Sequence, residues 1–419
     1  MTSSTWPEPQ KLATVFWSAL ALYFFVLPIA GTIALRYVAF VILLAVTAKL
    51  LVDTRTRPPL PFAGCWLAYF LVALVSVFFA VDPEMSLSEL RVEVLYWIAI
   101  FVVGVTWGRQ VPRFGQLVLL LAVINAILTL SAFQQVSLDM PFETVKHVHR
   151  FAYAGIDGNW LLIVMFLEAW LASQLWQQRR RAAAAALVIL IALDVWAMVA
   201  TQNRQNLVAL GAGVGTAAVL LLWQRFSWRR ATTLFGLLAL VVALIAVQIV
   251  RRPNSANLAP SATASEVSTE KLGSSVTADI RWTLWKFSLE KVGQHPWVGG
   301  GIGRQAFEKL YPEFEPENKL LWHAHNMVLN KGIQMGIPGM AAFLALWIGL
   351  AMELRRHLRR PGHAGSLAVA GLAIVAAIFF KNMSDDFFVR NVALFFWLAM
   401  GLLIGFLDSP QEAGTRPSY

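Results

Sequence analysis

The chain is a ladder of apolar segments, and this feature limits what it can fold into more than any other. About 20 consecutive apolar residues span the hydrocarbon core of a bilayer, and about twelve such segments follow one another along the chain. Backbone polar groups in lipid must be satisfied within the segment, so each one is expected to be a helix. The sequence therefore predicts an all-α, polytopic integral membrane protein. The expected spans are 12–30, 34–52, 61–80, 93–108, 114–133, 158–176, 183–201, 205–223, 231–250, 337–354, 364–383 and 390–407.

Composition agrees with this prediction and argues against other classes of protein. Hydrophobic residues make up 58% of the chain and charged residues only 14%. The net charge is +10, but the basic residues lie in short loops rather than in a basic domain, so no nucleic-acid partner is expected. The single cysteine, Cys65, excludes a disulfide framework and a cysteine metal site. No basic region precedes the first apolar run, so we expect no cleaved signal peptide.

The distribution of arginine predicts the orientation in the membrane. Every second loop is rich in arginine, whereas the opposite loops combine fewer basic residues with acids. By the positive-inside rule, both termini are then cytoplasmic and the longest polar loop lies outside. The arginine-rich loops are at 55–57, 109–113, 179–181, 225–230 and 355–360.

The longest polar interruption, residues 251–321, suggests a division of the chain into three parts. Its first half is small and polar and is expected to be a spacer or a lid. The three parts are transmembrane helices 1–9 at 1–250, a large outer loop with a further helix at 251–336, and transmembrane helices 10–12 with a cytoplasmic tail at 337–419.

The second half of this loop has the spacing of an amphipathic helix. Trp282, Trp285 and Leu289 recur with a helical period, which predicts a helix lying on the bilayer surface or against the bundle. His295-Pro296 should end that helix. The glycines at 299–303 would then allow a tight turn and a close approach of the backbone to a ligand.

A histidine motif follows the loop. His325-Asn326 is followed, after nine residues, by Gly336-Ile-Pro-Gly339 at the outer start of a late span. The predicted topology also brings Arg204, at the outer end of a middle span, and Arg281, on the amphipathic helix, to the same side of the membrane. Polar groups from distant parts of the sequence are thus expected to converge there.

With these residues the chain resembles the O-antigen ligase family, within the wider group of O-antigen polymerases and oligosaccharide ligases. The family carries His followed by Asn, Ser or Gln, then nine residues and Gly-x-x-Gly, and here His325, Asn326, Gly336 and Gly339 match. The order of Arg281, Trp285, His295-Pro296 and the glycine-rich turn is also similar, as is the position of Arg204. The layout of about twelve spans with one large loop is likewise typical of the ligases.

The resemblance implies a glycosyltransferase of the bacterial inner (cytoplasmic) membrane with a periplasmic active site. Such enzymes move a glycan from undecaprenyl pyrophosphate to a sugar hydroxyl of lipid A–core. We expect no cofactor and no metal, because two arginines could replace the divalent ion that many nucleotide-sugar enzymes need.

The chemistry of that reaction suggests a role for each candidate residue. His325 is the expected general base, since an ordinary histidine pKa lies near 6.5. Asn326 would orient it or bind substrate, and Arg204 and Arg281 would bind the pyrophosphate through their guanidinium groups. Each also has a structural reading, because arginines near a membrane boundary often only extend toward the headgroups. Further possible site residues are His323, Lys331, Gly336 and Gly339.

Four acidic residues have no assigned role. Glu168 and Asp194 fall within predicted spans, where charge is costly, and are either functional or a structural pair with each other or with Asn125. Asp385 and Asp386 form the nearest candidate for a metal site.

Other functions remain open. An O-antigen polymerase would use a second lipid-linked glycan as acceptor, and a protein O-oligosaccharyltransferase would use a protein hydroxyl. A transporter of lipid-linked glycans belongs to a different class and should show internal repeats or polar, broken helices near the midplane. The sequence shows no convincing repeat, and its polar cluster lies at the membrane boundary.

Overall fold

A computed structural model shows a helical protein. It describes residues 8–29, 31–111, 114–137, 158–200, 204–224, 276–312, 323–360, 362–384, 386 and 388–409. Within these ranges there are helices and no strand, as predicted. The expected span 231–250 and the first half of the long loop lie outside the described residues.

The helices follow the predicted spans closely. They are α1 Glu8–Val26, α2 Ile33–Asp53, α3 Ala63–Phe78, α4 Pro83–Leu90, the π-helix η1 Arg91–Leu95, α5 Tyr96–Gly108, α6 Phe114–Ser137, α9 Gly158–Gln177, α10 Arg181–Ala200, α11 Arg204–Gln224, α14 Val276–Gln294, α15 Ala306–Leu310, α16 Met327–Arg355, α17 His363–Asn382 and α18 Arg390–Leu407.

Eight helical segments of the described chain are long and apolar enough to cross a membrane. Three shorter apolar helices, at Lys11–Val26, Ala63–Phe78 and Phe114–Leu130, accompany them. The described part of the protein is therefore all-helical and contains multiple membrane-length helices.

Two helix starts lie ten residues before the predicted ones, at Pro83 rather than 93 and at Met327 rather than 337. The span expected at 93–108 begins earlier, because Asp82 accepts a hydrogen bond from the Met85 N–H and Pro83 occupies the first turn. The helix expected to begin at 337 begins at Met327, and its interruption at Gly336 lies where the start was predicted.

Helices α5 and α18 form the closest helix pair of the core. A Cβ added to Gly104 would lie 2.7 Å from the Leu398 carbonyl oxygen, and one added to Gly108 would lie 2.3 Å from the Leu402 carbonyl oxygen. On the facing helix, a Cβ added to Gly401 would lie 2.6 Å from the Phe101 carbonyl oxygen of α5, and one added to Gly405 would lie 2.3 Å from the Val105 carbonyl oxygen. Each helix thus contributes a Gly-xxx-Gly pair, the spacing that lets membrane helices approach to backbone contact.

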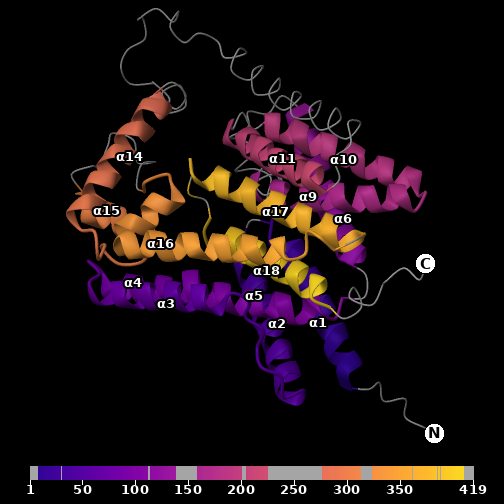
Figure 1. Ribbon diagram of the computed structural model, residues 1–419, viewed down its shortest axis with the longest axis horizontal. Helices are drawn as coiled ribbons and strands as arrows, with labels where there is room; N and C mark the ends of the chain where they lie inside the picture. The colour runs from indigo at the N-terminus through magenta and orange to yellow at the C-terminus, as the bar shows by residue number, and fades with distance from the viewer. Residues whose placement is uncertain are drawn as a thin grey trace, which may run out of the picture.

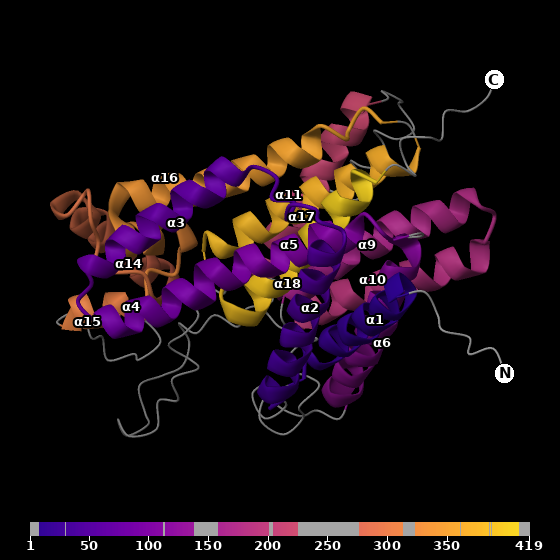
Figure 2. The ribbon, with the colours of Figure 1, turned by 90° about the horizontal axis from the view of Figure 1, so that it is seen from below.

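One end of the bundle gathers the elements of the long loop. Figures 1 and 2 both show α14 and α15 near the first turns of α16, with α4 at the same end of the bundle. Hydrogen bonds fix this arrangement: Val81 N–H donates to the Gly300 carbonyl at 3.0 Å, and Ile302 N–H donates to Ser76 Oγ at 3.2 Å. Lys309 on α15 forms an ion pair with Asp82. The loop helices are thus held on the ends of the membrane helices.

The opposite end gathers arginine-rich loops of the described chain. Arg360 Nη1 donates to the Leu407 carbonyl at the end of α18, and Arg109 lies 3.8 Å from Asp408. Phe62, at the start of α3, packs against Gly349 near the end of α16. Loops far apart in sequence therefore share one end, as the alternation of arginine predicted.

Candidate functional site

The His323–Asn326 segment leads directly into α16. Asn326 Oδ1 accepts hydrogen bonds from the N–H groups of Val328 and Leu329, both at 3.0 Å, which is the geometry of a helix N-cap. Its Nδ2 donates to the Met383 carbonyl at 2.9 Å. These bonds occupy Asn326 in starting α16 and holding it to the end of α17, so it fixes the backbone beside His325.

His325 has an unusual backbone. Its φ is +46°, in the left-handed region that non-glycine residues rarely adopt. Such conformations cost on the order of 1–3 kcal/mol and persist where the surroundings over-determine them, often at functional sites. The side chain is half-buried. His325 is thus held in place while remaining accessible at the end of the bundle.

His323 contacts both the backbone and the ring of His325. The His325 N–H donates to His323 Nδ1 at 3.0 Å, and the two ring centroids are 4.0 Å apart. On the other side of the His323 ring, Arg304 Nη2 lies 3.1 Å from Nε2. The His323 ring therefore lies between the backbone of His325 and the guanidinium of Arg304.

The pKa of His323 is strongly lowered, to about 2, first by burial and then by the nearby charges of His325, Arg304 and Arg281. Its Nδ1 accepts the His325 N–H, which also disfavours an imidazolium, because that form would carry a proton on Nδ1. His323 is therefore neutral across the working range and cannot readily take a proton. Of the two histidines, the accessible His325 is the better candidate for a base.

Arg281 lies on α14, as predicted, and faces this segment. Four residues further along the same helix face, Trp285 Nε1 donates to the Ala324 carbonyl at 3.1 Å. Arg281 is half-buried and close enough for its charge to lower the pKa of His323. The helix ends at Gln294, immediately before His295-Pro296, as expected.

Arg204 is the first residue of α11. The next residue, Gln205, donates to the Ser384 carbonyl at 3.1 Å, and Ser384 follows the Met383 carbonyl that Asn326 binds. The backbone of Arg204 therefore begins its helix at the same end of the bundle as His325, as the predicted topology requires.

The glycine-rich turn packs against protein. Gly300 and Gly301 N–H groups donate to the carbonyls of Ile333 and Gln334, both at 2.9 Å. An added Cβ at Gly299 would lie 2.2 Å from the Ile333 carbonyl oxygen. The close backbone approach expected for a ligand is thus made to α16 itself.

Gly336 and Gly339 have packing roles. Gly336, with φ +67° and ψ −168°, interrupts α16 in a conformation available essentially to glycine alone. The interruption lets Ile337 N–H donate to the Pro296 carbonyl at 2.8 Å. A Cβ at Gly339 would lie 2.3 Å from that of Met335. The motif glycines thus shape the helix that carries His325.

Lys331 points into the protein rather than toward a headgroup region. Its Nζ lies 2.5 Å from Glu93 Oε2 and 2.9 Å from Gln334 Oε1, and both charged groups are almost fully buried. Glu93 lies in η1, and such single π-helical turns often occur at functional sites. The Lys331–Glu93 ion pair connects the first turns of α16 to η1, the π-helical turn between α4 and α5.

Asp386 belongs to the same polar network. Its carboxylate accepts a hydrogen bond from Asn330 Nδ2, and its carbonyl accepts one from Arg304 Nη2 at 3.0 Å. Burial raises its pKa, while Lys331 and Asn330 act in the opposite direction. Its predicted neighbour in a metal site, Asp385, lies outside the described residues.

Glu168 and Asp194 form a buried cluster with Asn125 inside the bundle. Asn125 Nδ2 donates to Glu168 Oε1 at 3.1 Å and to Asp194 Oδ2 at 2.8 Å, and Thr129 donates to Asp194 at 2.7 Å. Trp160 Nε1 in turn donates to Asn125 at 3.2 Å. The cluster joins α6, α9 and α10, which agrees with the structural alternative for these acids.

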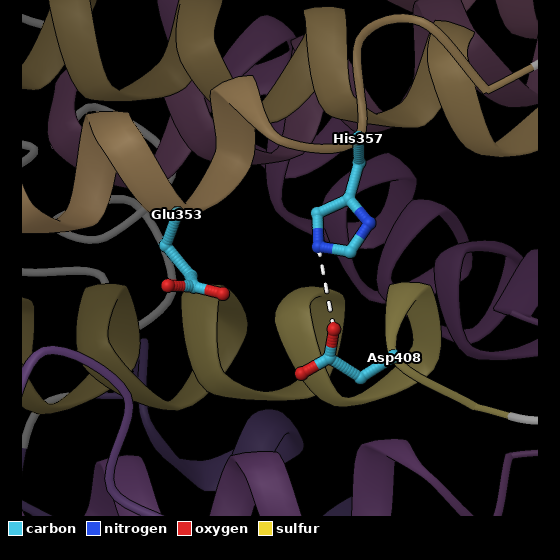
Figure 3. Close-up of side chains that lie close together, drawn as sticks. All are labelled: Glu353, His357 and Asp408. Carbon is cyan, nitrogen blue, oxygen red and sulfur yellow. Dashed lines mark ion pairs between the residues drawn. The ribbon is translucent and has the colours of Figure 1, made fainter.

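One group of side chains has the donor types of a metal site. Glu353, His357 and Asp408 place ligand atoms within 4.8 Å of one another, and Figure 3 shows the Asp408 carboxylate directed toward the imidazole with the Glu353 carboxylate to one side. His357 Nε2 lies 3.3 Å from Asp408 Oδ1. The hydrogen bond from His357, followed by the charges of His357, Arg109 and Arg360, lowers the pKa of Asp408 despite partial burial.

This cluster fits an internal ion-pair network better than a cation site. Arg356 Nη1 lies 2.7 Å from Glu353, so a bound cation would compete with arginines for both carboxylates. The cluster lies at the far end of α16 from His325. It therefore fastens the ends of α16 and α18 to each other.

Arg304 was not anticipated from the sequence, although a signal was present. It follows the glycine-rich turn in a loop where the positive-inside rule does not require arginine, which is the argument that singled out Arg204. Its two contacts, to His323 and to Asp386, depend on how the turn folds back onto α16.

Comparison with known proteins gives one family. A family model described as O-antigen ligase matches residues 185–344, a range that includes Arg204, Arg281, Arg304, both histidines and the motif glycines. A search of curated proteins gives no match. The match covers residues 185–344 of 419, and together with the membrane-length helices it shows that this part of the chain is similar to the O-antigen ligase family.

Proposed function

We propose that the protein transfers O-antigen polysaccharide from undecaprenyl pyrophosphate to lipid A–core, on the periplasmic face of the bacterial inner membrane. The observation that carries this proposal is the arrangement around His325. This half-buried imidazole is held in a left-handed backbone conformation above a neutral His323, with Arg281 and Arg304 close by. The family match supplies the class of reaction.

In the proposed reaction, His325 removes the proton from the acceptor hydroxyl as its oxygen attacks the anomeric carbon of the donor glycan. A new carbon–oxygen bond forms, the bond to the pyrophosphate breaks, and undecaprenyl pyrophosphate leaves with the bonding electrons. An accessible histidine suits proton removal near neutral pH, and the neutral His323 does not compete for that proton.

Arg204 and Arg281 bind the pyrophosphate in this scheme. Negative charge on the phosphate increases as the glycosidic bond breaks, and guanidinium groups fixed at that point stabilise the transition state. Arg281 comes from α14 and Arg204 from the start of α11, both at the end of the bundle that carries His325. The proposed clamp requires no metal.

The proposed periplasmic location rests on the separation of the two ends. The arginine-rich loops at 109 and 355–360 lie at the end opposite to His325, and arginine-rich loops remain in the cytoplasm. Both termini are then cytoplasmic. The lipid tail of the donor would lie against apolar helix faces.

A transfer assay with purified protein tests the proposal. The donor is undecaprenyl-pyrophosphate glycan, the acceptor is lipid A–core, and the buffer contains chelator. Arg204→Lys and Arg281→Lys should lower donor use by roughly tenfold or more each, because lysine keeps the charge but lacks the paired N–H groups of arginine. Activity that disappears with chelator and returns with a divalent ion would contradict the arginine clamp.

The alternative acceptors give different products in the same assay. Lengthening of the lipid-linked glycan without transfer to lipid A–core would identify a polymerase, and transfer to a protein hydroxyl would identify a protein O-oligosaccharyltransferase. A transporter would form neither product and would tolerate the loss of His325.

A further inference from the structure

A cavity lies at the end of the bundle opposite to His325. Its volume is about 870 Å³, and it lies between the ends of α9 and α11 and the start of α17. Trp170 Nε1 donates to the His363 carbonyl at 3.4 Å, and Gln174 Nε2 donates to Ser366 Oγ at 3.1 Å, so α9 and α17 are held together at its edge. The cavity is therefore built between packed helices.

The walls of this cavity are apolar and its rim is basic. Phe166, Leu221 and Val369 contribute to the walls, whereas Arg359 and Arg360 lie at the rim. Pockets that combine an apolar wall with a few placed polar groups are typical of binding sites for amphiphilic ligands. Among the described residues that line it there is no aspartate or glutamate.

A smaller lobe adjoins the first. Its volume is about 360 Å³, and it shares Trp223, Leu358 and Arg359 with the larger cavity, while Arg355 and Arg356 complete its basic side. The guanidinium of Arg359 lies 6.0 Å from the centroid of the Trp223 ring and is exposed. Arg359 thus stands at the junction of two apolar lobes.

The position along the membrane normal fits a lipid headgroup. Helix α16 connects the histidine segment to the arginine cluster, and its continuous part after Gly336, residues 337–355, is about 28 Å long at 1.5 Å per residue, which matches a bilayer core of about 30 Å. The cluster therefore lies at the membrane surface opposite to the histidines, where a phosphate of that leaflet would be found.

We propose that this two-lobed cavity binds an anionic phospholipid, with its phosphate on Arg359 and Arg355 and its acyl chains in the two lobes. Arginine pairs well with phosphate, and basic pockets between transmembrane helices are known binding places for anionic headgroups. The junction position of Arg359 matches a molecule with one charged head and two apolar chains. The bound lipid would brace α9, α11 and α17 and is independent of the transfer reaction.

Native mass spectrometry of the full-length protein in detergent provides the test. Dioleoyl phosphatidylglycerol is the probe and dioleoyl phosphatidylethanolamine the zwitterionic comparison. Each basic side chain at a membrane surface contributes about fivefold to binding of an anionic lipid, so Arg359→Gln should weaken phosphatidylglycerol about fivefold and the Arg355→Gln/Arg359→Gln pair about 25-fold. Binding of phosphatidylethanolamine should be weaker and unaffected.

Two further variants separate a built site from diffuse attraction. Arg180→Gln removes the same charge from the same end of the bundle, outside the cavity lining, and should leave binding unchanged. Ala169→Phe fills the larger cavity from an exposed position on α9 and should reduce lipid binding with every charge intact. Thermal melting of each variant confirms that the protein is folded.

Three results would overturn the proposal. Equal losses for Arg180→Gln and Arg359→Gln would show only diffuse electrostatic attraction. Unchanged lipid binding in Ala169→Phe would exclude acyl chains from the cavity. Displacement of the lipid by millimolar inorganic phosphate would show that the arginines bind free phosphate rather than a lipid.

Discussion

The backbone N–H of His325 donates to Nδ1 of His323 at 3.0 Å, so the first histidine of the His-x-His segment positions the second. His323 is buried and neutral, whereas His325 is accessible and held in a left-handed conformation. This relationship gives separate expectations for the two side chains.

Replacing His325 with asparagine should abolish transfer without unfolding the protein. Asparagine tolerates the left-handed region better than other non-glycine residues but cannot act as a base at neutral pH. We expect kcat to fall by roughly 10²–10⁴-fold. Binding of the donor, measured separately with labelled lipid-linked glycan, should stay within a fewfold of wild type. Loss of donor binding as well would mean that His325 holds substrate rather than moving a proton.

Arg304→Gln should lower kcat more than it changes KM for the donor, because Arg304 acts through His323. The charge of Arg304 lowers the pKa of His323, so its loss should raise that pKa, although burial remains the larger cause and keeps it below the ordinary value. Histidine titration by NMR would follow this shift. Arg304→Lys should restore part of kcat, and a pure KM effect would instead place Arg304 on the donor phosphates.

Lys331→Met should destabilise the protein by about 3–5 kcal/mol, because it leaves Glu93 buried without its partner. The Lys331→Met/Glu93→Gln pair removes both charges and should be closer to wild type. Thermal melting in detergent compares the two. A double variant no more stable than the single one would show that the cost is not electrostatic.

Gly405→Ala should destabilise the α5–α18 pair, since the new methyl group would lie 2.3 Å from the Val105 carbonyl oxygen. Gly215→Ala is a matched control in α11, where an added Cβ meets nothing within 4 Å. Alanine there should be neutral or stabilising by up to about 1 kcal/mol. Equal melting temperatures for the two variants would contradict close packing between α5 and α18.

The contact between His357 and Asp408 should make stability depend on pH in the acid range. Because the folded pKa of Asp408 is lowered, its contribution is fully present above the unfolded pKa, about 3.9, and is lost as pH falls through the folded value. Asp408→Asn should lower the melting temperature at pH 7 by an amount equivalent to about 1 kcal/mol. The difference in melting temperature between Asp408→Asn and wild type should shrink below pH 4. A difference that grows as the pH falls would contradict a lowered pKa of Asp408 in the folded protein.

Much of the fold could be predicted because long apolar runs in the sequence indicate membrane helices. The span at 390–407 is reproduced residue for residue, and that at 205–223 differs by one residue at each end. The start of α16 was misplaced by ten residues, because Gly336-Ile-Pro resembles a helix start, whereas Asn326 is the actual N-cap. Capping depends on a hydrogen bond that spacing alone does not reveal.

The site was only partly predictable. Motif spacing pointed to His325, and topology placed Arg204 and Arg281 at its end of the bundle. The partners of Lys331 and His323 could not be found in this way, because Glu93 and Arg304 reach them only when separate segments fold together. For the same reason, the glycines at 299–303 suggested a ligand contact, although their close neighbour is the backbone of α16.

The most direct test of the central claim is a purified transfer assay in which wild type and His325→Asn are compared with undecaprenyl-pyrophosphate glycan as donor and lipid A–core as acceptor. The account predicts glycan on lipid A–core with wild type and none with His325→Asn, from proteins that melt at similar temperatures. Equal transfer by the two proteins would contradict the assignment of His325 as the base.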